Sequence, residues 1–408
     1  SDRLGLPDGE AATLPTQGVA MALRLDAVAL DAWQALSGGL GDERAAVGVD
    51  AGYLPDRFAL RANELRWGSR RLHHLVLDGA REGSTWRAHI DARELAGQIE
   101  YRQGTGSQPG NVHARLQRLV IAAGEEEEVT TLLDEQPSSV PALDVVVEDF
   151  DLRGKKLGRL EVNAVNQGAE WQLHKLALRM PEARFEASGQ WGARGAGAGR
   201  RTAMDFKLAI DDAGALLARL GMAGVFRRGS GKLEGTVAWD GSPLALDYPS
   251  MAGKLHLDVR DGQFLKADAG VARLLGVLSL QALPRRLTLD FRDLFSEGFA
   301  FDFVRGDALI ARGVVSSNNL QMKGVNAAVL MDGRADIARE TQDLRVVVVP
   351  EINAGTASLV ASVINPATGL GTFLAQWVLR RPLMEAATQQ FQIDGTWSEP
   401  RIERVARS

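Results

Sequence analysis

Apolar and polar residues alternate along most of this 408-residue chain, in segments of about six to ten residues. Successive side chains of a β-strand point to opposite faces of the sheet, so the alternation predicts strands with one apolar and one polar face. In the run 286–292, for example, Leu287, Leu289 and Phe291 share one face. The same pattern predicts strands at Val19–Leu25, Arg57–Trp67, Leu72–Asp78, Leu160–Val165, Trp171–Arg179, Ala203–Ile210, Lys254–Val259, Phe299–Phe303 and Leu344–Val349.

Helical patterns are few and short. Two strands are followed by aspartate and then by a short helical pattern, first at Asp26 and again at Asp212. An aspartate at an N-cap can accept hydrogen bonds from the free N–H groups of the first helical turn, so both sites predict a repeated strand–helix unit. The chain is therefore predicted to be mainly β, an elongated and twisted antiparallel sheet with a few short helices. Three further strands end in glycine followed closely by Trp191, Trp239 or Trp397. These tryptophans are expected to pack at the ends of the sheet as structural residues.

Breaks in the alternation suggest a domain organisation. The longest break runs from Ala122 to Pro141 and contains the acidic run Glu125–Glu128, which predicts a solvated linker. We therefore divide the chain into a β region at 1–121, an acidic linker at 122–142, a second β region at 143–265 and a C-terminal β region at 266–408. In the C-terminal region, helices are expected at about 268–283, 356–364 and 370–388.

Composition excludes several classes of function. The chain has 47 basic and 52 acidic residues, interleaved, and a net charge of −5, so no surface for nucleic acid is indicated. It has no cysteine, and no hydrolase, nucleotide-binding or calcium-binding motif is present. His73 and His74 would point to opposite faces of a strand and could not chelate one metal. We therefore predict no catalytic residue, no metal site and no cofactor, and a protein that is not an enzyme.

The segment Ile352–Leu379 contains no charged residue. It is long enough to span a membrane, but Asn365, Pro366 and the following glycines should divide it into two shorter helices. The second helix combines apolar and basic residues in a way that is typical of a segment lying on an anionic bilayer. The predicted contact residues are Leu370, Phe373, Leu374, Trp377, Val378, Arg380 and Arg381. The alternative is a helix pair that closes the open end of the sheet core, and both interpretations stay open.

The first residues, Ser1, Asp2 and Arg3, form neither a basic leader nor an apolar segment. We interpret the chain as a fragment of a longer protein. Any membrane anchor is expected upstream of it.

Short motifs near the C-terminus are more specific than the alternation. They are Gly262–Lys266, Arg273–Gly276, Ser279–Leu287, Phe295–Asp302, Glu340–Leu344, Val349–Glu351, Asn353–Thr356 and Gly369–Phe373. With these motifs, residues 262–405 resemble the C-terminal region of YhdP-type members of the AsmA-like family. Upstream, Gly231–Gly235 together with Trp239 is similar to the general repeat of that family, whereas residues 1–140 resemble it only loosely.

This resemblance implies a periplasmic part of an inner-membrane-anchored protein whose sheet curls into an apolar groove and conducts phospholipid between the inner and outer membranes. It implies phospholipid as the partner, with the inner leaflet of the outer membrane and other envelope proteins as further partners. The expected groove residues are Leu287, Leu289, Phe291, Phe299, Phe301, Phe303, Leu344, Val346 and Val348. On this reading, polar substitutions such as Phe301→Asp, alone or combined with Leu289→Asp and Val346→Asp, should block transport without unfolding the chain.

Two alternatives remain at the level of sequence. The expected groove residues could instead form an ordinary core against the predicted helix 270–280. The whole chain could also serve as a structural or assembly scaffold of the cell envelope, which would require a closed interior filled by side chains.

Overall fold

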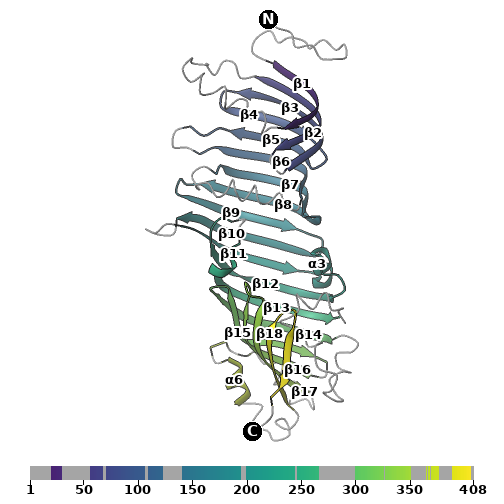
Figure 1. Cartoon of the computed structure of the whole chain (residues 1–408), viewed down its shortest axis with the longest axis vertical. Coiled ribbons are helices and arrows are strands. Elements are labelled where there is room, and N and C mark those ends of the chain that lie inside the picture. The colour runs from purple at the N-terminus through teal and green to yellow at the C-terminus, as the bar shows by residue number, and fades with distance from the viewer. Residues whose placement is uncertain are drawn as a thin grey trace. The chain divides into compact units, whose positions relative to one another are not determined.

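The computed structural model describes residues 20–29, 56–67, 70–105, 109–122, 140–193, 199–243, 246–265, 299–325, 327–350, 364, 366–367, 369–375 and 388–405. The chain divides into two compact units (Figure 1). Unit 1 comprises 1–179, 190–198 and 242–245, and unit 2 comprises 180–189, 199–241 and 246–408. Most of the described residues of each unit lie in strands of an open sheet.

Unit 1 is built from nine strands that pair in sequence order. They are β1 (Ala20–Ala29), β2 (Arg57–Trp67), β3 (Arg70–Glu82), β4 (Thr85–Asp91), β5 (Leu95–Arg102), β6 (Asn111–Ile121), β7 (Ala142–Leu152), β8 (Lys155–Asn166) and β9 (Glu170–Arg179). The pairs β1–β2 and β6–β7 are parallel, and the other pairs within this unit are antiparallel. The described residues of unit 1 contain no helix.

The parallel pair β6–β7 explains the long break in the sequence pattern. Parallel neighbours cannot be joined by a tight hairpin, because the chain must return to the edge at which the first strand began. Residues 122–141 connect these two strands in the sequence, and β6 and β7 pair along most of their lengths. The predicted linker therefore connects two neighbouring strands of one sheet.

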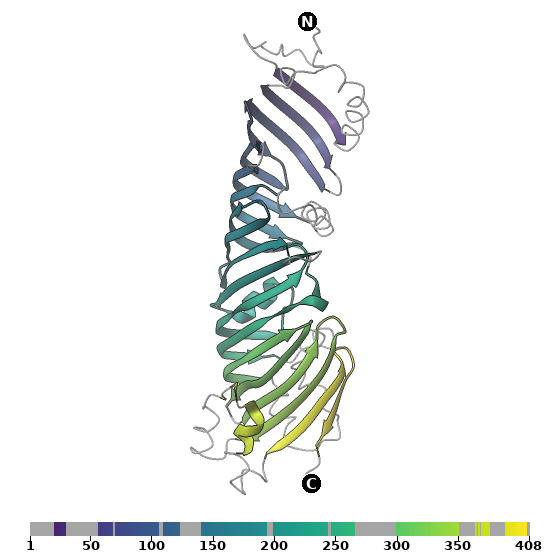
Figure 2. The same cartoon turned by 90° about the vertical axis from the view of Figure 1, so that its left-hand side faces the viewer.

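Unit 2 continues with strands that are paired antiparallel from β11 to β19. Its strands are β10 (Ala183–Ala193, of which 183–189 belong to this unit), β11 (Arg200–Ile210), β12 (Phe226–Asp240), β13 (Ala252–Phe264), β14 (Phe299–Ala311), β15 (Val314–Gly324), β16 (Ala327–Asp336), β17 (Thr341–Pro350), β18 (Gln389–Thr396) and β19 (Pro400–Arg404). Three short helical elements accompany them: α3 (Ala213–Arg219), the 3-10 helix η2 (Tyr248–Ser250) and α6 (Gly369–Phe373). Figure 2 shows the strong twist of these strands.

Helix α3 confirms the second predicted strand–helix unit. The side chain of Asp212 accepts a hydrogen bond from the backbone N–H of Ala215 at 2.9 Å, which satisfies one free donor of the first turn. Ala213 and Leu216 on this helix are buried in the core of unit 2. The first such unit, after Asp26, lies outside the described residues.

The predicted fold class is confirmed: the chain is mainly β, with open, twisted and largely antiparallel sheet and few helices. Nine of the ten predicted strand segments coincide with observed strands. The tenth, at 286–292, lies outside the described residues, as do the predicted helix 268–283 and most of those at 356–364 and 370–388.

Candidate functional site

One face of the unit 1 sheet is apolar across all nine strands. Residues that pair directly across neighbouring strands point to the same face. A single cross-strand row therefore joins Leu23, Leu60, Leu77, Ile90, Gly97, Leu116, Val147, Leu160 and Leu178. Every member of this row is a hydrocarbon side chain or glycine. We call the face that carries it the apolar face.

A second row lies two residues further along each strand and is equally apolar. Its members are Met21, Phe58, Gly79, Ala88, Ile99, Ala114, Val145, Val162 and Leu176. Two adjacent rows of this length make the apolar face a continuous band that follows the sheet from one strand to the next.

Gly97 shows how closely the strands approach within this band. Its φ of 145° is unfavourable for an L-residue, and an added Cβ would lie 2.4 Å from the carbonyl oxygen of Arg115. Glycine is therefore required where β5 is irregularly paired with β6, between Ala96 and Gly97. The row stays apolar there because glycine adds no polar group.

The opposite face of unit 1 carries ion pairs between strands. Arg87 on β4 contacts Glu100 on β5 at 3.0 Å, and His113 on β6 contacts Asp144 on β7 at 3.0 Å. Hydrogen bonds from Arg115, and to a lesser extent from His113, hold the pKa of the Asp144 carboxyl below its usual value. This charged face is stable in water, so solvent rather than another layer of protein can cover it.

The apolar face is only partly sealed within its own unit. Side chains of the band are partly exposed at Leu60, Leu77 and Ile99, and are buried at Ile90, Leu116, Val147 and Leu160. Among the described residues of unit 1, the apolar cluster is formed by strands of the same sheet together with Ala92 of the β4–β5 turn. Exposed apolar surface of this extent is unfavourable in water unless a partner covers it, so the band is the candidate functional site.

The expected groove residues of unit 2 lie together, but in a packed core. Phe299, Phe301, Leu344, Val346 and Val348 belong to one cluster and are between 0% and 5% exposed. This cluster lies on what we call the inner face of unit 2, the face that also carries Val304 and Met322. The structure thus brings these five residues together without exposing them on an open surface.

Phe303 departs from the expected pattern. Phe301 and Val304 both lie in the inner cluster although they are three residues apart, because a β-bulge interrupts β14 between Phe301 and Phe303. Phe303 pairs with Arg260 and lies under the guanidinium group of Arg305, 4.1 Å from its ring centroid. Its predicted place beside Phe301 is therefore wrong. Leu287, Leu289 and Phe291 lie outside the described residues.

Sequence reasoning did not select the apolar face of unit 1. The alternation correctly identified strands at Arg57–Trp67 and Leu72–Asp78. Alternation alone, however, says only that a strand has an apolar face, and it does not say whether that face is covered. The register of nine successive strands would have shown the continuous apolar face. That register cannot be read from the sequence of one strand alone.

The segment around α6 packs on the outer face of unit 2, opposite to the inner cluster, against β15 and β16 (Figure 2). Leu370, Phe373 and Leu374, predicted to contact a membrane, are buried in a cluster with Leu330 and Val347. In this arrangement their side chains are not available to a bilayer. Membrane contact by this segment stays a prediction that requires α6 to leave the sheet. Trp377, Val378, Arg380 and Arg381 lie outside the described residues.

Polar side chains of β15 hold the backbone that leads into α6. The amide of Asn318 donates to the carbonyl of Pro366 at 2.7 Å, and that of Asn319 donates to the carbonyl of Ile364 at 3.4 Å. The side chain of Gln321 accepts from the N–H of Ile364 at 3.4 Å. The segment is thus attached by hydrogen bonds at one end and by apolar contacts at the other.

We expect Leu370→Ala to weaken this attachment by about 2–5 kcal/mol, because it leaves a cavity in a fully buried cluster. Hydrogen–deuterium exchange of residues 364–375 should rise, while exchange in unit 1 stays unchanged. Thr372→Ala is the matched control, since Thr372 is exposed on the same helix. Equal exchange in the two variants would show that the apolar cluster does not hold α6.

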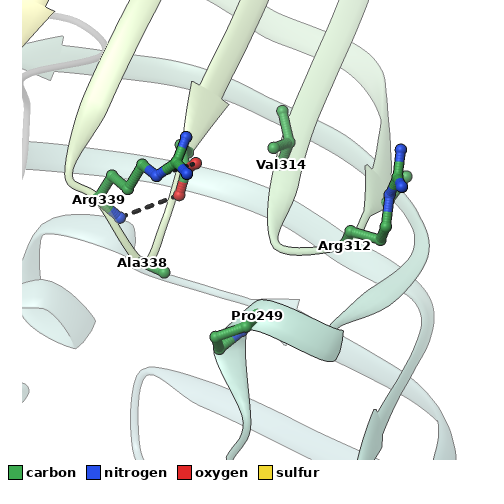
Figure 3. Close-up of a pocket in the computed structure, with 7 residues that line it drawn as sticks. Pro249, Arg312, Val314, Ala338 and Arg339 are labelled. Carbon is green, nitrogen blue, oxygen red and sulfur yellow. Dashed lines mark hydrogen bonds and ion pairs between the residues drawn. The ribbon is translucent and has the colours of Figure 1, made fainter.

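A cavity of about 640 Å³, lined by both charged and apolar residues, lies at the hairpin ends of unit 2 (Figure 3). Arg312 comes from the β14–β15 turn, Arg339 from the β16–β17 turn and Pro249 from η2. The backbone N–H of Arg339 donates to Asp336 at 2.9 Å, and the Arg339 guanidinium lies 3.8 Å from the same carboxylate, so the charges of this cavity are partly compensated. The cavity carries none of the expected groove residues.

The described residues contain no helix that is long and apolar enough to cross a membrane. They also contain no group of three or more histidine, aspartate or glutamate residues that could hold a metal ion.

Comparison with known proteins bears on the whole chain. A model of the YhdP protein family matches residues 2–402. The chain belongs to the YhdP family. It is 29% identical over 255 residues to the "Intermembrane phospholipid transporter YhdP" of Escherichia coli (strain K12), a match that covers 62% of this chain and 20% of the relative. The chain thus spans about a fifth of that relative's length. No solved structure matches. The predicted resemblance is confirmed, and it extends well beyond the C-terminal motifs that suggested it.

Proposed function

We propose that this chain carries phospholipid between two membranes without chemical reaction, and that the apolar face of unit 1 forms part of the path. The observation that carries the proposal is the apolar band that crosses nine paired strands without a charged side chain. The name of the E. coli relative, an intermembrane phospholipid transporter, supports the same function.

The physical role of such a band follows from the cost of exposing acyl chains to water. Each methylene removed from water contributes about 0.8 kcal/mol, so a lipid with two long chains cannot cross an aqueous compartment uncovered. Where apolar side chains continue from strand to strand, the acyl chains contact these side chains instead of water. A lipid can then move from strand to strand without a large free-energy barrier. No bond has to be made or broken.

The proposal includes the compartment and the partners. An intermembrane path places this chain in the periplasm, as part of a longer protein anchored in the inner membrane. The lipid is the principal partner, and the inner leaflet of the outer membrane is the acceptor surface. Other envelope proteins are further partners.

The scaffold alternative has one observation in its favour. The inner face of unit 2 is filled by its own side chains, as shown by Val346 and Phe301, which are 0% and 3% exposed. A closed interior is what a structural module requires. The partly exposed band of unit 1 does not fit that alternative, and we therefore place the lipid there.

Native mass spectrometry of the chain purified from bacterial envelopes, followed by lipid extraction, tests the proposal. We expect glycerophospholipid to remain bound. A folded chain that emerges free of lipid and takes up none from vesicles would contradict the proposal and favour the scaffold.

A further inference from the structure

The two edges of the apolar face differ in chemistry. At one edge, which we call the turn edge, β4 begins, β5 ends, and β6 and β7 begin. At the opposite edge, the far edge, β4 and β5 are joined through residues 92–94, and β6 and β7 end. Both edges are described on β4–β7, whereas the side chains of Trp67 and Arg70 at the far edge of β2 and β3 lie outside the described residues.

Amphipathic aromatic side chains occupy the turn edge on β4 and β5, and the same row continues as Val112 on β6 and Leu143 on β7. Trp86 on β4 pairs with Tyr101 on β5, and both lie on the apolar face, two residues beyond the row that contains Ile99. The guanidinium group of Arg81 lies 5.7 Å from the ring centroid of Trp86, and Tyr101 is 38% exposed. Indole and phenol rings with a cation beside them are typical of the boundary between hydrocarbon and polar headgroups in a bilayer.

The far edge of the same strands is hydrocarbon. The side chains that face the apolar side there are Leu95, Leu119, Ile121, Phe150 and Leu152.

We propose that bound phospholipid lies along the strands of unit 1, with its polar headgroup at the turn edge beside Arg81, Trp86 and Tyr101 and its acyl chains directed to the far edge. This inference rests on the proposed function and adds the orientation of the lipid. From Leu95 to Tyr101, β5 rises about 20 Å at about 3.3 Å per residue. One leaflet of a bilayer core is about 15 Å thick, half of a core of roughly 30 Å, so the strand is long enough for extended chains.

The arrangement also assigns roles to the edge residues. The Arg81 guanidinium lies 3.9 Å from the carboxylate of Asp56. In the proposed arrangement it donates hydrogen bonds to the phosphate that all glycerophospholipids share. Trp86 and Tyr101 present apolar ring surface to the first methylenes and an N–H or O–H group to the ester region. A lipid held in this way moves from strand to strand sideways, with its headgroup always at the same edge.

Fluorescence quenching by spin-labelled lipid measures this orientation directly. The chain has no cysteine, so a single one can be introduced for a fluorophore. Gln103→Cys lies just beyond the turn-edge end of β5, and Arg93→Cys lies just before its far-edge end. Both positions are exposed. The whole chain is loaded with phosphatidylcholine that carries a nitroxide either on the headgroup or at the end of an acyl chain.

We expect the headgroup nitroxide to quench the label at position 103 severalfold more than the label at position 93, and the chain-end nitroxide to show the reverse. Adding Trp86→Leu and Tyr101→Leu to each labelled chain should reduce this difference while lipid remains bound. Equal quenching at both positions, or an inverted pattern, would overturn the orientation and leave the proposed function intact. Absence of quenching by both lipids would overturn the two proposals together.

Discussion

Phe301→Asp is expected to destabilise unit 2 by at least about 4 kcal/mol, the range of the most disruptive core substitutions. Phe301 is 3% exposed, and its ring centroid lies 5.4 Å from those of both Phe226 and Phe264. Aspartate removes these contacts and places a carboxylate among hydrocarbon side chains. This expectation replaces the earlier one, in which Phe301 lined an open groove and aspartate spared the fold.

Thermal and urea unfolding measure the effect. Ala300→Asp is the matched control, because Ala300 is exposed at the neighbouring position of the same strand. It should unfold within about 0.5 kcal/mol of the original chain, as surface substitutions usually do. If Phe301→Asp unfolds like Ala300→Asp, the side chain at 301 is not part of a packed core, and the inner face of unit 2 is open after all.

Ile99→Asp is expected to weaken phospholipid binding to unit 1 by about 3 kcal/mol, the cost of aspartate at the centre of an apolar membrane-like environment. This corresponds to a loss of affinity on the order of 100-fold. Ile99 lies in the second row of the apolar face, between Ala88 and Ala114, and is partly exposed. A carboxylate there can stay hydrated in the empty protein, so the fold should survive while the lipid path is interrupted.

Titration with a fluorescent phospholipid measures the affinity, and thermal unfolding checks the fold. Gln98→Asp is the control, because Gln98 is the exposed neighbour on the charged face, where it pairs with Arg115. Its affinity for lipid should not change. Equal loss in both variants would indicate a general charge effect, and no loss in either would place the lipid elsewhere in the chain.

The sequence was sufficient to predict strands, because alternation is local: the pleat of a strand sends neighbouring side chains to opposite faces. The N-cap of α3 could be predicted for the same reason, since Asp212 and Ala215 are three residues apart. Phe303 shows where local reasoning fails. A single bulge in β14 changes which residues of the strand face the core, and no residue type at 301–303 predicts it.

The amphipathic segment after Pro366 gives a second example. Leu370, Phe373 and Leu374 form an apolar surface that suits a membrane and a protein core equally well. Residues far away in the sequence determine which surface this segment packs against. They are Leu330, Val347 and the amide side chains of β15.

The sequence by itself determined the class of fold, the family and the apolar character of one face of each strand. The tertiary structure alone decided which of those faces are closed. In unit 2 the inner side chains are packed against one another and against α3, so Phe301 and Val346 are core residues. In unit 1 nine strands align their apolar residues in register, and partly exposed side chains remain along the band. Burial depends on register and on contacts between distant strands, and neither is encoded within a single strand.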